Sequence, residues 1–322
     1  MLIATLPTLT GTETQNLSEE ILRHSLVDGA RYNTGGASPY TPKQILETLK
    51  PIADRYKKIL YVDLEGRQAR VAAWTPFSRG AVTLNRDFNI ELPGKIHFRR
   101  GGWCDIVNAL PEERKIFFKS HRTKEEYYLG ESQSVNVVAK NFEVKGYLYG
   151  DDFEYIKAAV ELDISHFMLS FTESLYDVVD FYAAYHEHGT INDLPNPQLV
   201  LKIESQKGIE FVKKSSRHFL REFRLMAARD DLFLSFADKR PEFLSALKLI
   251  IKKNPKAILA SKILSGLLDY PYEVSVGDMT DITLMNHLGY RHFMLQDELA
   301  DNFELTMQNW QKIIVPLLRE KL

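Results

Sequence analysis

The chain has 322 residues, of which 44% are hydrophobic and 26% are charged, and its formal net charge is -2. This balance is typical of a globular protein with one large domain, or with one large and one small domain, and it gives no electrostatic reason to expect nucleic acid as a partner. The one cysteine, Cys104, excludes an internal disulfide and a zinc site built on a cysteine pair.

The distribution of apolar residues bears on membrane association. No run of about 18 apolar residues exists, so we expect no transmembrane helix. The first residues lack the basic start and the long apolar stretch of a signal peptide. We therefore expect a cytoplasmic protein with no membrane partner.

Short apolar runs alternate with longer amphipathic stretches in the first part of the chain. The predicted strands are 2–6, 30–32 and 58–63, and the predicted helices are 16–28 and 42–56. From 71 to 144 the pattern changes to short β-like segments, broken by Pro76, Gly80, Pro93 and Gly94. This stretch predicts a small β-rich insertion.

The alternation resumes after the insertion. The predicted strands are 166–170, 198–203, 232–236, 257–260 and 292–295. The predicted helices are 152–162, 174–188, 208–227, 242–253, 281–288 and 302–321.

Eight strand–helix repeats predict an α/β fold in which a parallel sheet closes into a (β/α)8 TIM barrel. We expect the barrel at 1–70 and 145–322, with 71–144 inserted after the third strand as a β-rich lid domain over the catalytic face. A doubly wound open sheet is the alternative fold, but no glycine-rich nucleotide-binding fingerprint supports it.

Polar residues stand where the predicted strands end, and this is the edge at which such barrels place their chemistry. They are Arg31 and Asn33 after the second strand, Asp63 after the third, Ser170 after the fourth, Lys202 and Glu204 at the fifth, Asp238 after the sixth and Ser261 after the seventh.

Lys202 and Glu204 point to the same side of their strand, because side chains repeat every two residues. Glu204 and Asp238, on neighbouring strand ends, provide two carboxylates that suit Mg2+ or Mn2+ together with water and substrate oxygens. Lys202 beside the metal can stabilise an enolate oxygen or a phosphoryl group in transfer.

Each of these signals has an ordinary structural alternative. Lys202 and Glu204 could form a surface ion pair, and Asp238 could cap a helix. Asp63 could belong to a plain turn, and Arg31 could form a structural ion pair. The joint placement on successive strand ends favours a functional site.

Read in order, these segments resemble the pyruvate kinase family. The most specific match is Leu201-Lys202-Ile203-Glu204-Ser205-Gln206-Lys207-Gly208, against Lys-Ile-Glu-Asn-x-x-Gly. Other matches in the family's order are Ile3-Ala4-Thr5-Leu6, Ala30-Arg31-Tyr32-Asn33, Val62-Asp63-Leu64-Glu65-Gly66 with Arg70, Met168-Leu169-Ser170-Phe171, Ile258-Leu259-Ala260-Ser261-Lys262-Ile263-Leu264 and Phe293-Met294-Leu295-Gln296-Asp297-Glu298.

The resemblance implies a role for each matched residue. Lys202 would lie at the transferred phosphoryl group, and Ser261 would replace a threonine near the enolate methylene. Glu204 and Asp238 would hold the divalent metal. The implied phosphate and substrate contacts are Arg31, Arg70 and Ser170, and Asn33 and Asp63 would lie at a monovalent-cation site.

The chain also departs from the family. The family's Ala-Arg-Gly-Asp-Leu-Gly becomes Ser235-Phe236-Ala237-Asp238-Lys239-Arg240, and the short helix that holds the substrate carboxylate is expected to be missing. Arg240 and Lys239 could supply a new anion contact. Leu64 and Gly35 replace cation ligands, so we expect little or no K+ requirement.

Three functions stay open on this basis. One is a genuine pyruvate kinase, a phosphotransferase that uses phosphoenolpyruvate with ADP or ATP. Another is a relative acting on a different enolisable or phosphorylated acid, with carbon–carbon lyase chemistry included. The third is a non-catalytic binding or regulatory protein that retains the barrel. The resemblance favours a monomer or a homodimer.

Overall fold

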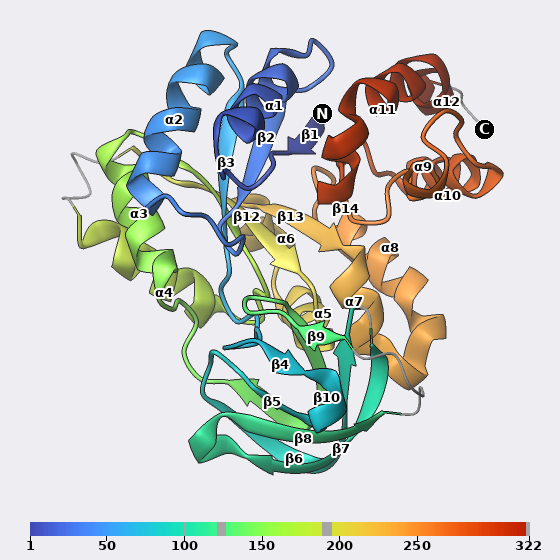
Figure 1. The fold of residues 1–322 in the computed structure, drawn as a ribbon. Coiled ribbons are helices and arrows are strands. Elements are labelled where there is room, and N and C mark those ends of the chain that lie inside the picture. Colours follow the sequence, from blue (N-terminus) through green and yellow to red (C-terminus); the bar gives the residue numbers. More distant parts are fainter. Residues whose placement is uncertain (100, 121–126, 189–194, 320–322) are drawn as a thin grey trace.

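The computed structural model describes residues 1–99, 101–120, 127–188 and 195–319, without the side chain of Asp238. Eight parallel strands close into a barrel in the ring order β1-β15-β14-β13-β12-β11-β3-β2, which confirms the predicted closed barrel (Figure 1). These strands are β1 (Leu2–Thr5), β2 (Gly29–Asn33), β3 (Ile59–Leu64), β11 (His166–Leu169), β12 (Gln198–Ile203), β13 (Arg224–Ala228), β14 (Ile258–Ala260) and β15 (His292–Met294).

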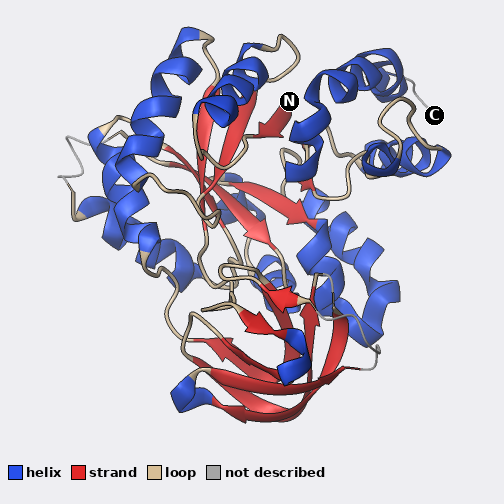
Figure 2. Ribbon diagram, viewed as in Figure 1, coloured by secondary structure: helices blue, strands red, loops and turns tan. Residues whose placement is uncertain are grey.

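Helices surround the barrel (Figure 2). They are α1 (Thr12–Arg23), α2 (Pro42–Arg55), α3 (Asp151–Glu161), α4 (Leu175–His186), α5 (Gln206–Lys214), α6 (Arg217–Arg221), α7 (Arg229–Phe236), α8 (Phe243–Lys253), α9 (Gly266–Asp269), α10 (Val276–Leu288), α11 (Phe303–Asn309) and α12 (Val315–Arg319). Among the described ranges, none of the helices is long and apolar enough to cross a membrane.

Local signals set several helix ends. Thr41 caps α2 by accepting a hydrogen bond from the backbone N–H of Gln44, and Pro42 opens the helix with its φ already fixed. The predicted closing helix, 302–321, is divided into α11, a π-helical turn (Trp310–Ile314) and α12, and its last two residues lie outside the described part.

Apolar side chains fill the inside of the barrel, and polar ones follow them towards the strand ends. The interior layer consists of Ile3, Tyr61, Met168, Val200, Met226, Ile258, Ala260 and Met294. Two residues further along three of these strands stand Asp63, Ser170 and Lys202, on the same side of their strands as the interior layer. Because side chains alternate along a strand, a polar layer lies directly above the apolar interior layer.

The sixth strand is not where the sequence predicted it. The predicted helix 208–227 divides into α5, α6 and the strand β13, and the predicted strand 232–236 lies in α7. Arg224–Ala228 contains no β-branched residue, so its composition favours a helix, yet it pairs in parallel with β12 and β14. Burial between two strands overrides the local preference.

Between β3 and β11 the chain forms antiparallel sheets, which we call the β unit (residues 75–144). Its strands are β4 (Thr75–Pro76), β5 (Ala81–Thr83), β6 (Phe88–Phe98), β7 (Gly102–Leu110), β8 (Lys115–Ser120), β9 (Tyr128–Leu129) and β10 (Val135–Val144). Five of them form a sheet in the order β10-β6-β7-β8-β5, and β4 pairs with β9. Buried side chains such as Phe88, Phe98 and Ile116 give the β unit a core of its own.

Two arginines fasten the chain segments that join the β unit to the barrel. Arg86, only 2% exposed, donates hydrogen bonds to the carbonyls of Gly66, Lys145, Gly146 and Tyr147. Arg67 donates to the carbonyls of Val144 and Gly146 and pairs with Asp177 of α4 at 2.5 Å. The incoming and outgoing segments are thus tied to each other and to a barrel helix.

Replacing Arg86 with Met should lower the free energy of unfolding by about 3 kcal/mol, because several buried carbonyls would lose their donor. Chemical denaturation of the purified protein measures this. Arg79→Met, at an exposed position of the same β unit, is the matched control and should change stability little. Equal stability of the Arg86 variant and wild type would contradict this role.

Candidate active site

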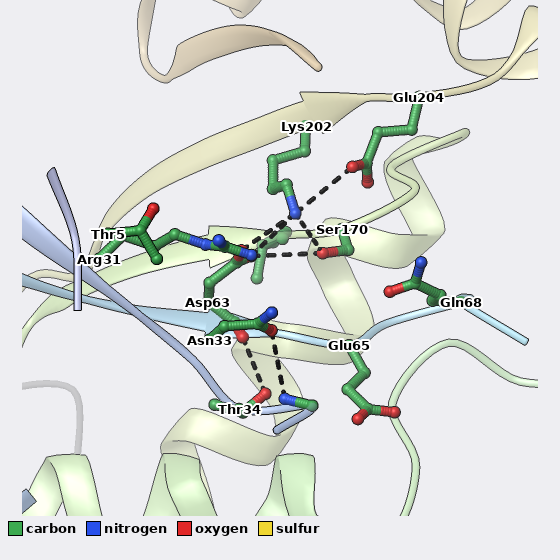
Figure 3. Close-up of polar contacts among 12 residues, drawn as sticks. Thr5, Arg31, Asn33, Thr34, Asp63, Glu65, Gln68, Ser170, Lys202 and Glu204 are labelled. Carbon is green, nitrogen blue, oxygen red and sulfur yellow. Dashed lines mark hydrogen bonds and ion pairs between the residues drawn. The ribbon is translucent and has the colours of Figure 1, made fainter. Parts of the chain in front are cut away.

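A buried carboxylate lies at the centre of the polar layer. Asp63, at the end of β3, is 1% exposed. Its Oδ2 atom is 2.6 Å from Nε of Arg31 on β2, and its two oxygens are 3.1 and 3.0 Å from Nζ of Lys202 on β12 (Figure 3). Arg31 also binds Asp297 at 2.6 Å. Two cations therefore share one buried anion.

The pKa values in this cluster follow from burial and charge. Burial opposes ionisation of Asp63, but Lys202 and Arg31 outweigh it and hold the pKa of this carboxyl below its usual range. Burial likewise works against the charge of Lys202, but Asp63 and Glu204 outweigh it and raise the pKa of the ammonium group. Lys202 is thus held as a cation inside the protein.

The Lys202 ammonium also contacts the neighbouring strand ends. Its Nζ lies 2.7 Å from Oγ of Ser170, after β11, and 3.4 Å from Oε1 of Glu204 (Figure 3). The hydroxyl of Ser170 donates to Asp63 at 3.3 Å. The structure thus brings together Arg31, Asp63, Ser170, Lys202 and Glu204, and a lone surface ion pair is excluded because Lys202 and Glu204 are 6% and 4% exposed.

Glu204 differs from Asp63 in its electrostatics. Its Oε2 atom accepts a hydrogen bond of 2.7 Å from the backbone N–H of Phe171. Burial raises the pKa of Glu204 to about 7, with the charge of Lys202 acting in the opposite direction and that of Asp231 adding to the rise. A further positive charge near Glu204 would therefore be stabilising.

A cavity of about 620 Å3 opens above this layer, between the strand ends and the β unit. Its basic lining residues are Arg31, Arg70, Arg99, Lys202 and Lys262, and its acidic ones are Glu204, Asp230, Asp231, Asp297 and Glu298. The two sets balance in charge, so a bound divalent cation would give this cavity a net positive charge and favour an anionic ligand.

The second carboxylate at this cavity is Asp231, which the sequence pattern did not predict. Asp231 lies in the first turn of α7, directly after the true sixth strand, and its Oδ1 accepts a hydrogen bond of 2.9 Å from Asn136 of β10. Burial raises the pKa of Asp231, opposed by the hydrogen bond from Asn136. The signal for it was the acidic pair after the apolar run Leu225–Ala228.

Asp238 follows α7 in a 3-10 segment (Ala237–Glu242) instead of ending a strand. Its side chain lies outside the described part of the structure. The expectation that Asp238 stands directly after the sixth strand is wrong, because it depended on taking α7 for a strand. A short helix, α7, lies between the sixth strand and Asp238.

The remaining predicted residues fall in different places. Arg70 lines the cavity, with its Nε 3.0 Å from Oε1 of Glu65 and its Nη1 2.8 Å from the carbonyl of Ser132. Arg240 is exposed on the 3-10 segment, with its guanidinium 5.0 Å from the ring centre of Phe233, and it is not among the residues that line the cavity.

Ser261, which also lines the cavity, stands in a strained turn after β14. Ser261 and Lys262 both have positive φ values, 63° and 56°, which side chains other than glycine rarely adopt. Arg229 holds this turn through a 3.0 Å hydrogen bond from its Nε to the Ser261 carbonyl, and is itself held by Asp281. Such strain persists where the surroundings fix it, which is common at functional sites.

The expected monovalent-cation residues are already engaged with protein groups. Asn33 Oδ1 accepts a hydrogen bond of 3.2 Å from the N–H of Gly35, and both oxygens of Asp63 are bound by Lys202, with Arg31 on one of them. Leu64 is fully buried and apolar.

Within the described ranges, no group of three or more His, Cys, Asp or Glu residues could hold a metal ion. The arrangement at the cavity is a pair, Glu204 and Asp231. Comparison of the sequence with protein-family models and with curated proteins finds no match.

The raised pKa of Glu204 predicts how stability depends on pH. The folded protein keeps the Glu204 proton up to about pH 7, whereas an unfolded chain loses it near its ordinary value of 4.5. Stability is therefore lost as the pH rises between these values, by about 3 kcal/mol for this group.

Glu204→Gln should remove that part of the slope. Metal-free unfolding free energies measured from about pH 5 to about pH 8 should fall more steeply for wild type than for the variant. Other buried carboxyls, such as Asp152, contribute equally to both proteins and cancel in the comparison. Parallel curves would rule out the raised pKa.

Proposed function

We propose that this protein is a divalent-metal-dependent enzyme of the pyruvate kinase type, acting on phosphoenolpyruvate, pyruvate or a related enolisable or phosphorylated acid. The observation that carries the proposal is the pair Glu204 and Asp231 beside a buried lysine. These two carboxylates, on adjoining strand ends, both have raised pKa values and line one cavity with Lys202.

The residues present fit Mg2+ or Mn2+. Hard divalent cations take carboxylate oxygens and often retain several waters, so two carboxylates are a sufficient protein ligand set. Oε1 of Glu204 lies 3.4 Å from Nζ of Lys202. Oδ1 of Asp231 accepts a hydrogen bond from Asn136, which leaves Oδ2 of Asp231 as a ligand atom. When bound, the cation would polarise oxygen atoms of the acid and offset developing negative charge.

Lys202 supplies a fixed positive charge at the same place. Asp63 and Ser170 hold its ammonium group at 3.0 and 2.7 Å, so it does not need to reorganise when negative charge develops on a substrate oxygen. Arg31 is bound to Asp63 and Asp297 and acts mainly as a positioning residue. Arg70 and Ser261 line the cavity where they can meet the acid.

The corrected sixth strand strengthens the resemblance. Ala228-Arg229-Asp230-Asp231-Leu232 now stands against the family's Ala-Arg-Gly-Asp-Leu, which supports Asp231 as the aspartate of the proposed metal pair. The first glycine is replaced by Asp230, which pairs with Lys262 at 3.4 Å. A new ion pair in the substrate cavity supports an altered substrate.

Contacts between the β unit and the barrel rim support its proposed role as a lid. Asn136 of β10 binds Asp231 after β13, and Arg99, which follows β6, pairs with Glu298 after β15. These contacts lie on opposite sides of β14 in the ring. A β unit held in this way would exclude water from the reacting groups.

Mg2+ should stabilise the wild-type protein, and the variants Glu204→Gln and Asp231→Asn should lose this effect. At 100 times its dissociation constant, a bound ion stabilises the folded state by about 2.7 kcal/mol, which thermal unfolding detects readily. Asp238→Asn is the matched control and should retain the full shift. A Mg2+ response lost with Asp238 instead, or absent from wild type, would refute the assigned pair.

A coupled assay with phosphoenolpyruvate, ADP and Mg2+ tests the substrate. If the protein is a genuine pyruvate kinase, it turns over, and Lys202→Met lowers kcat by about 100-fold or more because a preorganised charge is lost. Lys239→Met, at an exposed lysine outside the cavity, should leave the rate unchanged. Because Arg31 and Lys202 already neutralise Asp63, omission of K+ should have little effect.

An inactive protein that still binds Mg2+ through Glu204 would point to another acid as substrate. A protein with neither activity nor a Mg2+ response would be the non-catalytic binding protein that the resemblance left open.

A further inference from the structure

A second cavity adjoins the first. It has a volume of about 180 Å3 and lies between the edge strand β10 and the ends of β11 and β12. Its walls include residues 135–139 of β10, Phe171, Glu173 and residues 204–207. Glu204 and Asn136 line both cavities, so the smaller one opens beside the carboxylate proposed to hold the metal.

Val138 and Phe171 contribute apolar side chains to the wall of the smaller cavity. Val138 is two residues from Asn136 along β10, so its side chain emerges on the same face of the strand, towards the barrel. Neither Val138 nor Phe171 is among the residues packed in the hydrophobic cores of the described structure. Both are half-buried and line the cavity, so their apolar surfaces can meet a ligand there.

Phe171 is held in an unusual conformation. Its φ is 49°, a value that is rare for a bulky residue, and its backbone N–H donates to Glu204 at 2.7 Å. The strain is thus fixed by a contact to the proposed metal ligand, and it places an aromatic residue at the junction of the two cavities.

Three polar side chains of the smaller cavity are hydrogen-bonded within the protein, whereas Nε of Arg67, another lining residue, has no hydrogen-bond partner in the described structure. Ser205 Oγ donates to Glu173 at 2.5 Å, Gln206 Nε2 donates to the Ser235 carbonyl at 2.6 Å, and Lys207 Nζ donates to the Phe142 carbonyl at 2.9 Å. A polar ligand therefore gains little at these three side chains, whereas an apolar ligand gains by leaving water against Val138 and Phe171.

We propose that the smaller cavity binds the apolar side chain of the substrate, whose acid group lies near Glu204 and Asp231 in the larger cavity. This inference depends on the proposed function and names its substrate class: a 2-oxo acid, or its enol or phosphoenol form, that carries a branched or aromatic side chain. A volume of 180 Å3 corresponds to about six water molecules, which is enough for such a group.

The test is a series of 2-oxo acids titrated calorimetrically into the Mg2+-loaded protein: pyruvate, 2-oxobutanoate, 4-methyl-2-oxopentanoate and phenylpyruvate. Each methylene buried in the cavity should lower Kd by about fourfold. Equal Kd values along the series, or binding of none of the acids, would overturn the inference. The Mg2+ response of the protein without acid tests the metal site separately.

Two variants of Val138 sharpen this test. Val138→Trp should fill the cavity, leaving the Kd of pyruvate within about twofold and removing the gain of the larger acids. Val138→Ala should enlarge the cavity and shift the preference towards phenylpyruvate. Val107→Trp, at a position of β7 that is 58% exposed, is the control and should retain the wild-type order. A wild-type order in both Val138 variants would exclude the smaller cavity as the side-chain site.

Discussion

The buried carboxylate of Asp63 is the constraint on which the site depends. An ion this far from water must be neutralised, and Arg31 does so from β2, next to β3, while Lys202 does so from β12, beyond β11 on the other side. The same contacts keep Lys202 charged and fix its direction. The network that neutralises the buried Asp63 therefore also fixes the lysine of the proposed chemistry. Within it, Glu204 is the carboxylate that another cation would stabilise.

The β unit contributes to the site as well as the barrel. The strand ends provide Lys202, Glu204 and Asp231, but Asn136, which orients Asp231, comes from β10. Arg86 and Arg67 bind the two segments that connect the β unit to the barrel. These contacts help to hold Asn136 within hydrogen-bond distance of Asp231. The same strand, β10, also forms a wall of the smaller cavity. Metal geometry and substrate choice would then share one structural support.

Glu204 stands between two different environments. On one side lies the larger cavity, with equal numbers of acidic and basic side chains, and on the other lies the smaller one, with Val138 and Phe171 as unpacked apolar walls. Compared with the family pattern, the ion pair of Asp230 and Lys262 changes the first environment. In the proposed enzyme, the metal would lie on the larger cavity and the substrate side chain in the smaller one, with Glu204 and Asn136 at both.

The sequence by itself determined the barrel, because apolar runs that alternate with amphipathic segments along most of the chain leave few other ways to bury them. It also determined the positions of Asp63, Ser170, Lys202 and Glu204. A residue two positions after a buried one lies on the same face of the strand, which here is the face towards the inside of the barrel. It did not determine the sixth strand. Arg224–Ala228 has the composition of a helix, and only pairing with β12 and β14 makes it extended. Tertiary structure therefore decided that Asp231, and not Asp238, follows that strand. It also decided which cavity each residue lines, because the contacts between strand ends join residues from 32 positions apart, as for Arg31 and Asp63, to 139 apart, as for Asp63 and Lys202, and no local pattern records them.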